Sequence, residues 1–126
     1  MEDFEQKVIN DVVIEIVNLS RATWKEAHQF KLILQADIDK KFKKIVVDIS
    51  QVEFMDSTFL GTLVLGKRNS LQIGGDLKLV EPLSVFQTLM ERTSTLNVFD
   101  TYKTLKDAIS SFKESKQVKV SAPLHV

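Results

Sequence analysis

The residue pair Asp56-Ser57 carries the most recognisable chemistry in this sequence. The apolar segment from Ile45 to Ile49 predicts a strand, a short connector follows, and Asp56-Ser57 stands where a helix is expected to begin. This order places a serine hydroxyl at a helix N-terminus on the surface, where a phosphoryl group could be added without disturbing a core. The plainer alternative is an N-cap, in which either side chain only accepts bonds from the first amides of the helix.

Ser57 lacks the sequence context of a catalytic serine. Met55 and Phe59 stand where a nucleophile elbow has glycines. His28, expected to be half-buried in a helix, and His125, near the C-terminus, are not obvious general bases for Ser57. Two separated histidines without cysteines also make a poor metal site. We therefore predict no enzymatic activity, no metal and no cofactor.

The segment from Gly61 to Lys67 matches most of the phosphate-binding loop pattern. Arg68, however, occupies the position of the magnesium-binding hydroxyl, and the intervening residues are mainly apolar. Leu63 and Val64 also belong to a helical stripe, whose amides are bonded within the helix. A small nucleotide-binding protein is therefore the least favoured hypothesis.

Length and composition suggest one soluble domain. The chain has 126 residues, and 17 basic residues balance 17 acidic ones, so no broad field favours nucleic acid or anionic lipid. The absence of cysteine excludes disulfides and thiolate chemistry. The acidic N-terminus does not resemble a signal peptide, and no apolar run is long enough to span a bilayer. We expect a cytoplasmic monomer that neither binds nucleic acid nor inserts into a membrane.

The elements expected around Asp56-Ser57 alternate between strands and helices. Segments 4–9 and 12–17 predict a hairpin, and Thr23 with Glu26 has the spacing of a capping box before a helix with an apolar stripe. After the strand at 45–49, a helix from Ser57 is expected to bury Leu60, Leu63, Val64 and Leu71 and to end at Gly74-Gly75. Later segments predict a strand at 77–80, a helix from Pro82, a short strand at 97–99 and an amphipathic helix through Phe112.

The pattern as a whole predicts a single α/β domain at residues 1–113, followed by a flexible tail at 114–126. Its mostly parallel sheet of about five strands, opened by a β-hairpin, would pack against about four helices. Four lysines, Lys40, Lys41, Lys43 and Lys44, follow the first long helix. We expect them to complement the helix dipole and stay solvated, in preference to forming a phosphate-binding patch.

Residues 46–57, Val-Val-Asp-Ile-Ser-Gln-Val-Glu-Phe-Met-Asp-Ser, followed by Leu60-Gly61, resemble the signature of the STAS domain family, in particular its anti-sigma factor antagonists. The segment from Ile73 to Leu77 is similar to the family's next helix-to-strand turn. The resemblance covers nearly the whole chain and implies the fold described above. It also implies a bacterial signalling phosphoprotein that regulates transcription by partner switching.

In antagonists of this type, the serine after the aspartate is phosphorylated by a serine kinase that is also an anti-sigma factor. The unphosphorylated form binds that kinase, and a serine phosphatase resets the switch. The matching position is Ser57. The resemblance implies a partner-binding patch made of Met55, Asp56, Ser57, Thr58 and Phe59, with Ser20, Arg21 and Thr23 nearby.

Two departures from the family pattern support an alternative function. Thr58-Phe59 stands where many antagonists have a small residue followed by glycine, and residues 17–20 lack the common Gly-x-Leu-Asp pattern. In the alternative, the chain is a non-switching STAS scaffold subunit of a stress-signalling or lipid-transport assembly. Ser57 would then serve only as a helix cap.

Overall fold

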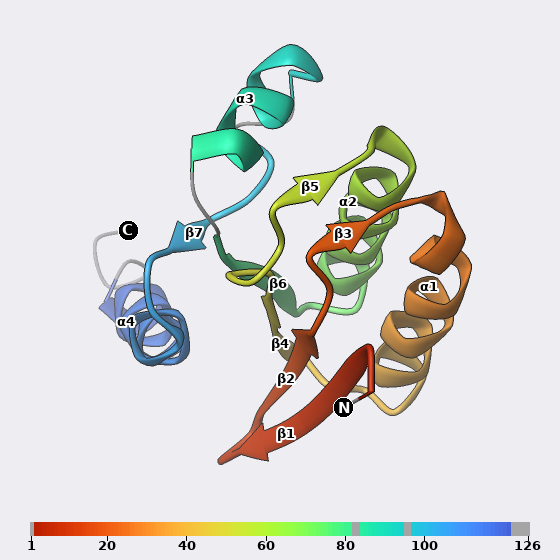
Figure 1. The fold of residues 1–126 in the computed structure, drawn as a ribbon. Coiled ribbons are helices and arrows are strands. Elements are labelled where there is room, and N and C mark those ends of the chain that lie inside the picture. The colour runs from red at the N-terminus through yellow and green to blue at the C-terminus, as the bar shows by residue number, and fades with distance from the viewer. Residues whose placement is uncertain (1, 82–83, 95–96, 122–126) are drawn as a thin grey trace.

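A mixed five-stranded sheet forms the centre of the computed structural model, which describes residues 2–81, 84–94 and 97–121 (Figure 1). The strand order is β1-β2-β4-β6-β7; β1 and β2 are antiparallel, and the other neighbours are parallel. This confirms the predicted α/β fold with its initial hairpin. The strands are β1 (Phe4–Ile9), β2 (Val12–Val17), β4 (Lys44–Asp48), β6 (Asp76–Val80) and β7 (Thr101–Tyr102).

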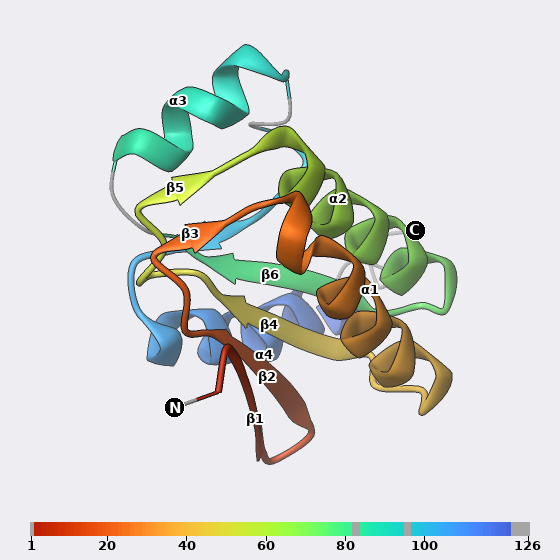
Figure 2. The same cartoon turned by 45° about the vertical axis from the view of Figure 1, so that its right-hand side comes forward.

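Helices cover both faces of this sheet. Figure 1 shows α1 (Trp24–Asp39) and α2 (Ser57–Gln72) on one face and α4 (Leu105–Ser121) on the other. The shorter α3 (Ser84–Arg92) lies at the end of the sheet towards which the parallel strands run, and Figure 2 shows it above β5. Alternate residues of β2 and β4 enter the two cores: Val13 and Val47 pack under α1 and α2, whereas Ile14 and Val46 pack under α4. Covering on both faces explains why β4 reads as a continuous apolar run.

The local signals at α1 act as predicted. The Thr23 side chain accepts from the Lys25 amide, and Glu26 accepts from the Thr23 amide, which completes the capping box. The predicted stripe along this helix is buried: Ala27, Phe30, Leu34 and Ile38. These contacts fix the position of the α1 N-terminus beside the start of α2.

Several local predictions were wrong. Leu71, expected on the inner face of α2, is 53% exposed, and His28 is exposed because it lies off the buried stripe of α1. The last strand is β7 at 101–102, and not 97–99. Helix α4 continues to Ser121, past residue 113, through residues with good helix propensity such as Glu and Lys, and the flexibility of the tail at 114–126 stays a prediction. The predicted cap region at Pro82 and the end of the tail, 122–126, lie outside the described residues.

A second, two-stranded sheet was not predicted. Strand β3 (Arg21–Ala22) pairs in parallel with β5 (Phe54–Met55), and the carbonyl of Ser20 accepts from the amides of Glu53 and Phe54. Figure 2 shows β3 leading into α1 and β5 leading into α2, side by side. This short pairing brings two helix N-termini together.

Candidate functional site at the start of helix α2

The carboxylate of Asp56 caps α2 and also accepts a hydrogen bond from the first residue of α1. Its Oδ1 accepts from the amide of Phe59 in α2 at 2.9 Å, and its Oδ2 accepts from the amide of Trp24 in α1, also at 2.9 Å. Its backbone amide donates to the carbonyl of Ala22. One half-buried side chain therefore joins the positive ends of two helix dipoles and neutralises part of their charge.

Ser57 is the first residue of α2, and its side chain is exposed. Within the described residues, its hydroxyl has no recorded hydrogen-bond partner. Thr58 beside it is also exposed, so two hydroxyls flank the capped helix start. Because Asp56 is the N-cap, Ser57 is not needed for that structural role.

The loop before α1 lies next to this helix start, as predicted. Ser20 and Arg21 are exposed, and Thr23 is partly exposed. The guanidinium of Arg21 lies 4.3 Å from the ring centroid of Phe54 across the β3–β5 pair. This cation–π contact holds an arginine and an aromatic ring on the surface beside Asp56.

Two members of the predicted partner-binding patch face inward. Met55 is 6% exposed, and Phe59 is fully buried, with its ring stacked on that of Phe30 at a centroid distance of 5.3 Å. The bulk of Phe59 therefore lies in the core and not beside the Ser57 hydroxyl. Neither side chain offers surface to a partner in this conformation.

Two exposed aromatic residues were missing from the prediction. Trp24 is 66% exposed, and Phe54 is 41% exposed. Trp24 stands three residues before the buried Ala27, so helical spacing alone would have placed it near the core, and no local pattern marks Phe54. We use the term helix-start surface for the exposed side chains that surround Asp56: Arg21, Trp24, Phe54, Ser57 and Thr58.

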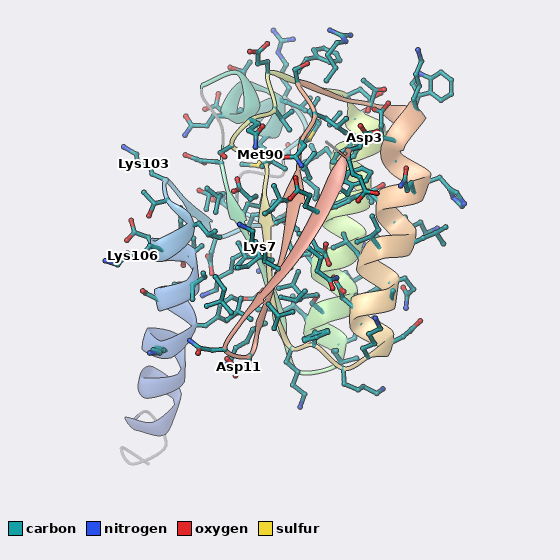
Figure 3. The ribbon with its side chains drawn as sticks, turned by 60° about the horizontal axis from the view of Figure 1, so that its bottom comes forward. Asp3, Lys7, Asp11, Met90, Lys103 and Lys106 are labelled. Carbon is teal, nitrogen blue, oxygen red and sulfur yellow. The ribbon has the colours of Figure 1, made fainter. Side chains whose placement is uncertain are left out.

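A shallow apolar groove lies between β5 and α3, next to the helix-start surface. Its volume is about 380 Å³, and its lining is mainly apolar. Met90, labelled in Figure 3, is buried close by. The groove is lined by Val52, Glu53, Phe54, Met55, Thr88, Leu89 and Arg92.

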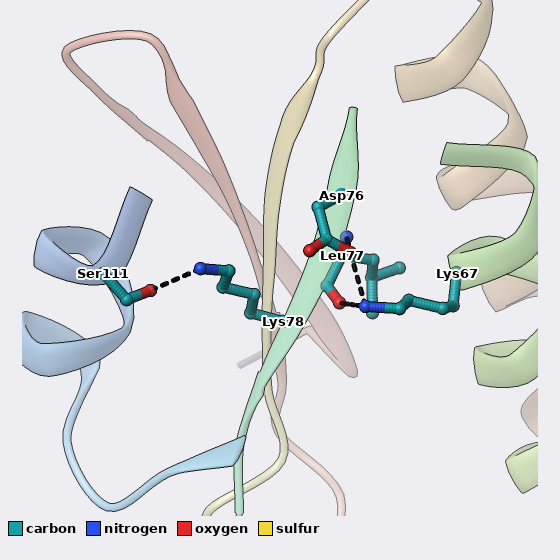
Figure 4. Close-up of polar contacts among 5 residues, drawn as sticks. All are labelled: Lys67, Asp76, Leu77, Lys78 and Ser111. Carbon is teal, nitrogen blue, oxygen red and sulfur yellow. Dashed lines mark hydrogen bonds and ion pairs between the residues drawn. The ribbon is translucent and has the colours of Figure 1, made fainter. Parts of the chain in front are cut away.

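The phosphate-loop-like segment is structural. Gly61 to Lys67 lies inside α2, and Lys67 is buried, with its Nζ bonded to the Asp76 carboxylate and near the carbonyl of Leu77 (Figure 4). A side chain at Gly66 would collide with Leu34 of α1. This segment therefore locks α2 onto β6 and α1 and offers no free amides to a phosphate.

The described part of the chain meets the requirements of neither a membrane span nor a metal site: it has neither a spanning helix nor a metal-binding cluster. No helix there has the length and apolar character to cross a membrane. No group of three or more His, Cys, Asp and Glu side chains there has the arrangement to hold a metal ion.

The fold is an α/β domain, and its most distinctive residues, Asp56 and Ser57, lie at the start of helix α2. The family model of the STAS domain matches residues 2–108, and the chain belongs to that family. A Thermotoga maritima protein, provisionally named an anti-sigma factor antagonist, is 28% identical over 111 residues, which cover 87% of this chain and 97% of that protein. Its Thermotoga neapolitana counterpart is 29% identical over 84% of this chain and 94% of its own length.

Solved structures agree with this assignment. The crystal structure of the T. maritima protein TM1081 matches with a TM-score of 0.76 and 27% identity, covering 86% of this chain and 92% of that one. The unphosphorylated form of the anti-sigma factor antagonist SpoIIAA matches with a TM-score of 0.70 at 15% identity, over 87% and 97% of the two chains. At that identity, the second match shows the fold alone.

Proposed function

We propose that this protein is a phosphoswitch of the anti-sigma factor antagonist type. Its unphosphorylated form binds a serine protein kinase that is also an anti-sigma factor, phosphorylation of Ser57 releases that partner, and a serine phosphatase restores the binding form. The protein acts as a cytoplasmic binding module and not as an enzyme. The relatives named as anti-sigma factor antagonists support this class of partner.

The observation that carries the proposal is the separation of roles between two adjacent residues. Asp56 is the N-cap of α2 and also accepts from the first amide of α1, whereas the exposed Ser57 hydroxyl bonds to no other described residue. A kinase can therefore reach and modify Ser57 without breaking a contact that holds the fold. If the Ser57 side chain were the N-cap, its hydrogen bonds to the helix amides would have to break before the hydroxyl could be phosphorylated.

Phosphorylation should change the stability of the fold little. A phosphoserine adds about −1.5 to −2 charges at neutral pH. At the first turn of α2 the helix dipole favours this charge by roughly 0.3–1 kcal/mol. Repulsion from the half-buried Asp56 carboxylate opposes it by a similar, solvent-screened amount. The two effects nearly cancel.

Binding should respond far more strongly. Exposed tryptophan, arginine and phenylalanine, here Trp24, Arg21 and Phe54, are the residue types that most often anchor protein interfaces. A partner packed over them would cover the Ser57 hydroxyl and would have to bury a dianion beside Asp56. Leaving such a charge desolvated and unpaired costs roughly 2–5 kcal/mol, which lowers affinity tens to thousands of fold.

The test uses paired substitutions at the two neighbouring hydroxyls. Wild type, Ser57→Ala, Ser57→Glu and the control Thr58→Glu are incubated with ATP in a lysate of the source organism, and the phosphorylated position and the retained proteins are identified by mass spectrometry. We expect phosphorylation at Ser57 in wild type, and a kinase retained by Ser57→Ala but lost from Ser57→Glu. Thr58→Glu should weaken binding less, because it leaves the Ser57 hydroxyl free.

The same experiment separates the switch from the scaffold alternative. In a constitutive scaffold, Ser57→Glu and wild type retain the same proteins and Ser57 carries no phosphate. That outcome would overturn the proposal. The melting temperatures of all four proteins should be similar, so a loss of binding can be assigned to recognition.

A further inference from the structure

A second candidate site lies at the end of α2 opposite to Ser57. A cavity of about 880 Å³ is bounded by the loop after α1, the turn after α2, the first residues of β4 and β6, and Phe112 of α4. Asp11, at the β1–β2 turn labelled in Figure 3, closes one side. The 16-residue helix α2 runs from the helix-start surface to this cavity.

The charge around this cavity is strongly positive. Among the residues whose side chains the structure describes, five lysines and two aspartates line it, which gives this set a net charge of +3. Both aspartates are in ion pairs: Asp11 with Lys44 at 2.6 Å, and Asp76 with Lys67 of α2. Lys41 and Lys43 are exposed, and neither takes part in a salt bridge among the described residues. Their charge is therefore available to an anion.

Three apolar side chains also line the cavity. Phe42 and the exposed Leu71 lie on the side of the sheet covered by α1 and α2, and Phe112 lies on the side covered by α4. The Nζ of Lys78 lies 4.4 Å from the centroid of the Phe112 ring. It also donates to Ser111 at 2.8 Å (Figure 4), so a cation is held beside Phe112. Positive charge and apolar surface thus face the same space.

The lysine-bearing loop is held in place by backbone contacts. The amide of Phe42 donates to the carbonyl of Asp37 at 3.1 Å, and the amide of Asp76 donates to the carbonyl of Lys43 at 2.8 Å. Gly75 packs so closely on the Lys43 backbone that a side chain there would overlap it. A loop fixed on both sides loses little entropy when it binds a ligand.

We propose that this cavity binds a small organic phosphate with an apolar or aromatic body. The net charge suits a dianion, lysines bind phosphate as point charges, and the apolar side chains in the lining accept the body of the ligand. Complementing the α1 dipole explains Lys40 at the C-cap, but it does not explain why Lys43 and Lys78 share a cavity with Phe112. The site does not depend on the proposed role of Ser57.

The test is an amide NMR titration of the whole protein with phenyl phosphate, inorganic phosphate and phenol. Phenyl phosphate carries both features of the ligand, and each of the other probes carries one. We expect saturable shifts confined to residues around 40–44, 71 and 74–78, with millimolar affinity. Inorganic phosphate and phenol should each bind roughly tenfold more weakly or not at all, since each loses at least about 1.4 kcal/mol.

Substitutions separate the contribution of the lysine charges from that of the apolar side chains. The double variant Lys41→Glu/Lys43→Glu should weaken phenyl phosphate binding roughly tenfold or more, whereas Lys25→Glu, on the exposed first turn of α1, should not change it. Leu71→Ser should weaken phenyl phosphate and leave inorganic phosphate unaffected. The proposal fails if no saturable shift occurs, if inorganic phosphate binds as well as phenyl phosphate, or if Lys25→Glu matches the double variant. Well-dispersed spectra establish that each variant is folded.

Discussion

Two buried acids, Glu15 on β2 and Asp37 on α1, make the stability of this fold depend on pH. Each is 1% exposed, and Nε2 of Gln6 donates to Oε2 of Glu15 at 2.7 Å and to Oδ1 of Asp37 at 3.1 Å. Burial, reinforced by the hydrogen bond to Asp37, raises the pKa of Glu15 from 4.5 to about 9. Burial also raises the pKa of Asp37, while the charge of Lys40 opposes both shifts.

The sign of the effect follows from the proton that Glu15 retains on folding. Its contribution to stability is fully present below its unfolded pKa of 4.5 and is lost as the pH rises through about 9, because only the unfolded chain ionises in that interval. One proton corresponds to roughly 1.4 kcal/mol per pH unit. Between pH 4.5 and pH 7, Glu15 alone therefore lowers the free energy of unfolding by about 3 kcal/mol.

Glu15→Gln tests this directly, because an amide can still accept from Gln6 and donate to Asp37 but cannot ionise. The free energy of unfolding is measured with urea from pH 5 to pH 8 for wild type, Glu15→Gln and the exposed control Glu91→Gln. We expect the advantage of Glu15→Gln over wild type to grow by about 2–3 kcal/mol between pH 5 and pH 7. If the difference in the free energy of unfolding between Glu15→Gln and wild type stays constant with pH, whatever the size of that difference, Glu15 does not retain a proton on folding.

The remaining predictions concern α2 and the residues that flank it, and urea unfolding measures all of them. Asp56→Ala removes the acceptor for amides of two helices and should cost roughly 1–3 kcal/mol, so an unchanged stability would contradict the double cap. Gly75→Ala should cost roughly 1–3 kcal/mol, because its new methyl group would overlap the Lys43 backbone. The new methyl group of Gly61→Ala meets nothing within 4 Å, so this substitution should instead stabilise α2 by roughly 0.5–1 kcal/mol. If Gly75→Ala and Gly61→Ala changed the free energy of unfolding in the same direction, the close packing of Gly75 on Lys43 would be contradicted.

Local signals in the sequence were sufficient to predict the order of the main elements. The strand–connector–helix pattern around Asp56-Ser57, the capping box at Thr23 and the periodic stripe of α1 each depend on neighbours within a few residues, and each has the predicted structure. The left-handed Asn10 likewise forms the expected hairpin turn, at φ 57°. These features are specified by the backbone and nearby side chains.

Features that depend on distant residues could not be predicted in this way. The bond from the Trp24 amide to Asp56 joins residues 32 apart, and the two-residue strands that create it are too short to show a pattern. The buried pair of Glu15 and Asp37 joins a strand to a helix, and each carboxylate looks like a surface residue when its own element is considered alone. The exposed Leu71 lines a cavity to which the β1–β2 turn, the loop after α1 and α4 also contribute, so its environment could not be predicted from α2 alone.

The division of roles over a few consecutive residues explains how a surface serine can change without affecting the fold. Met55 and Phe59 are anchored in the core, and Asp56 ties the two helices together through both of its oxygens. Between these anchors, the side chain of Ser57 is left on the surface. Substitution of Phe59 or Asp56 should therefore reduce stability, whereas substitution of Ser57 should alter only what the domain binds. Such independence is what a site of reversible modification requires.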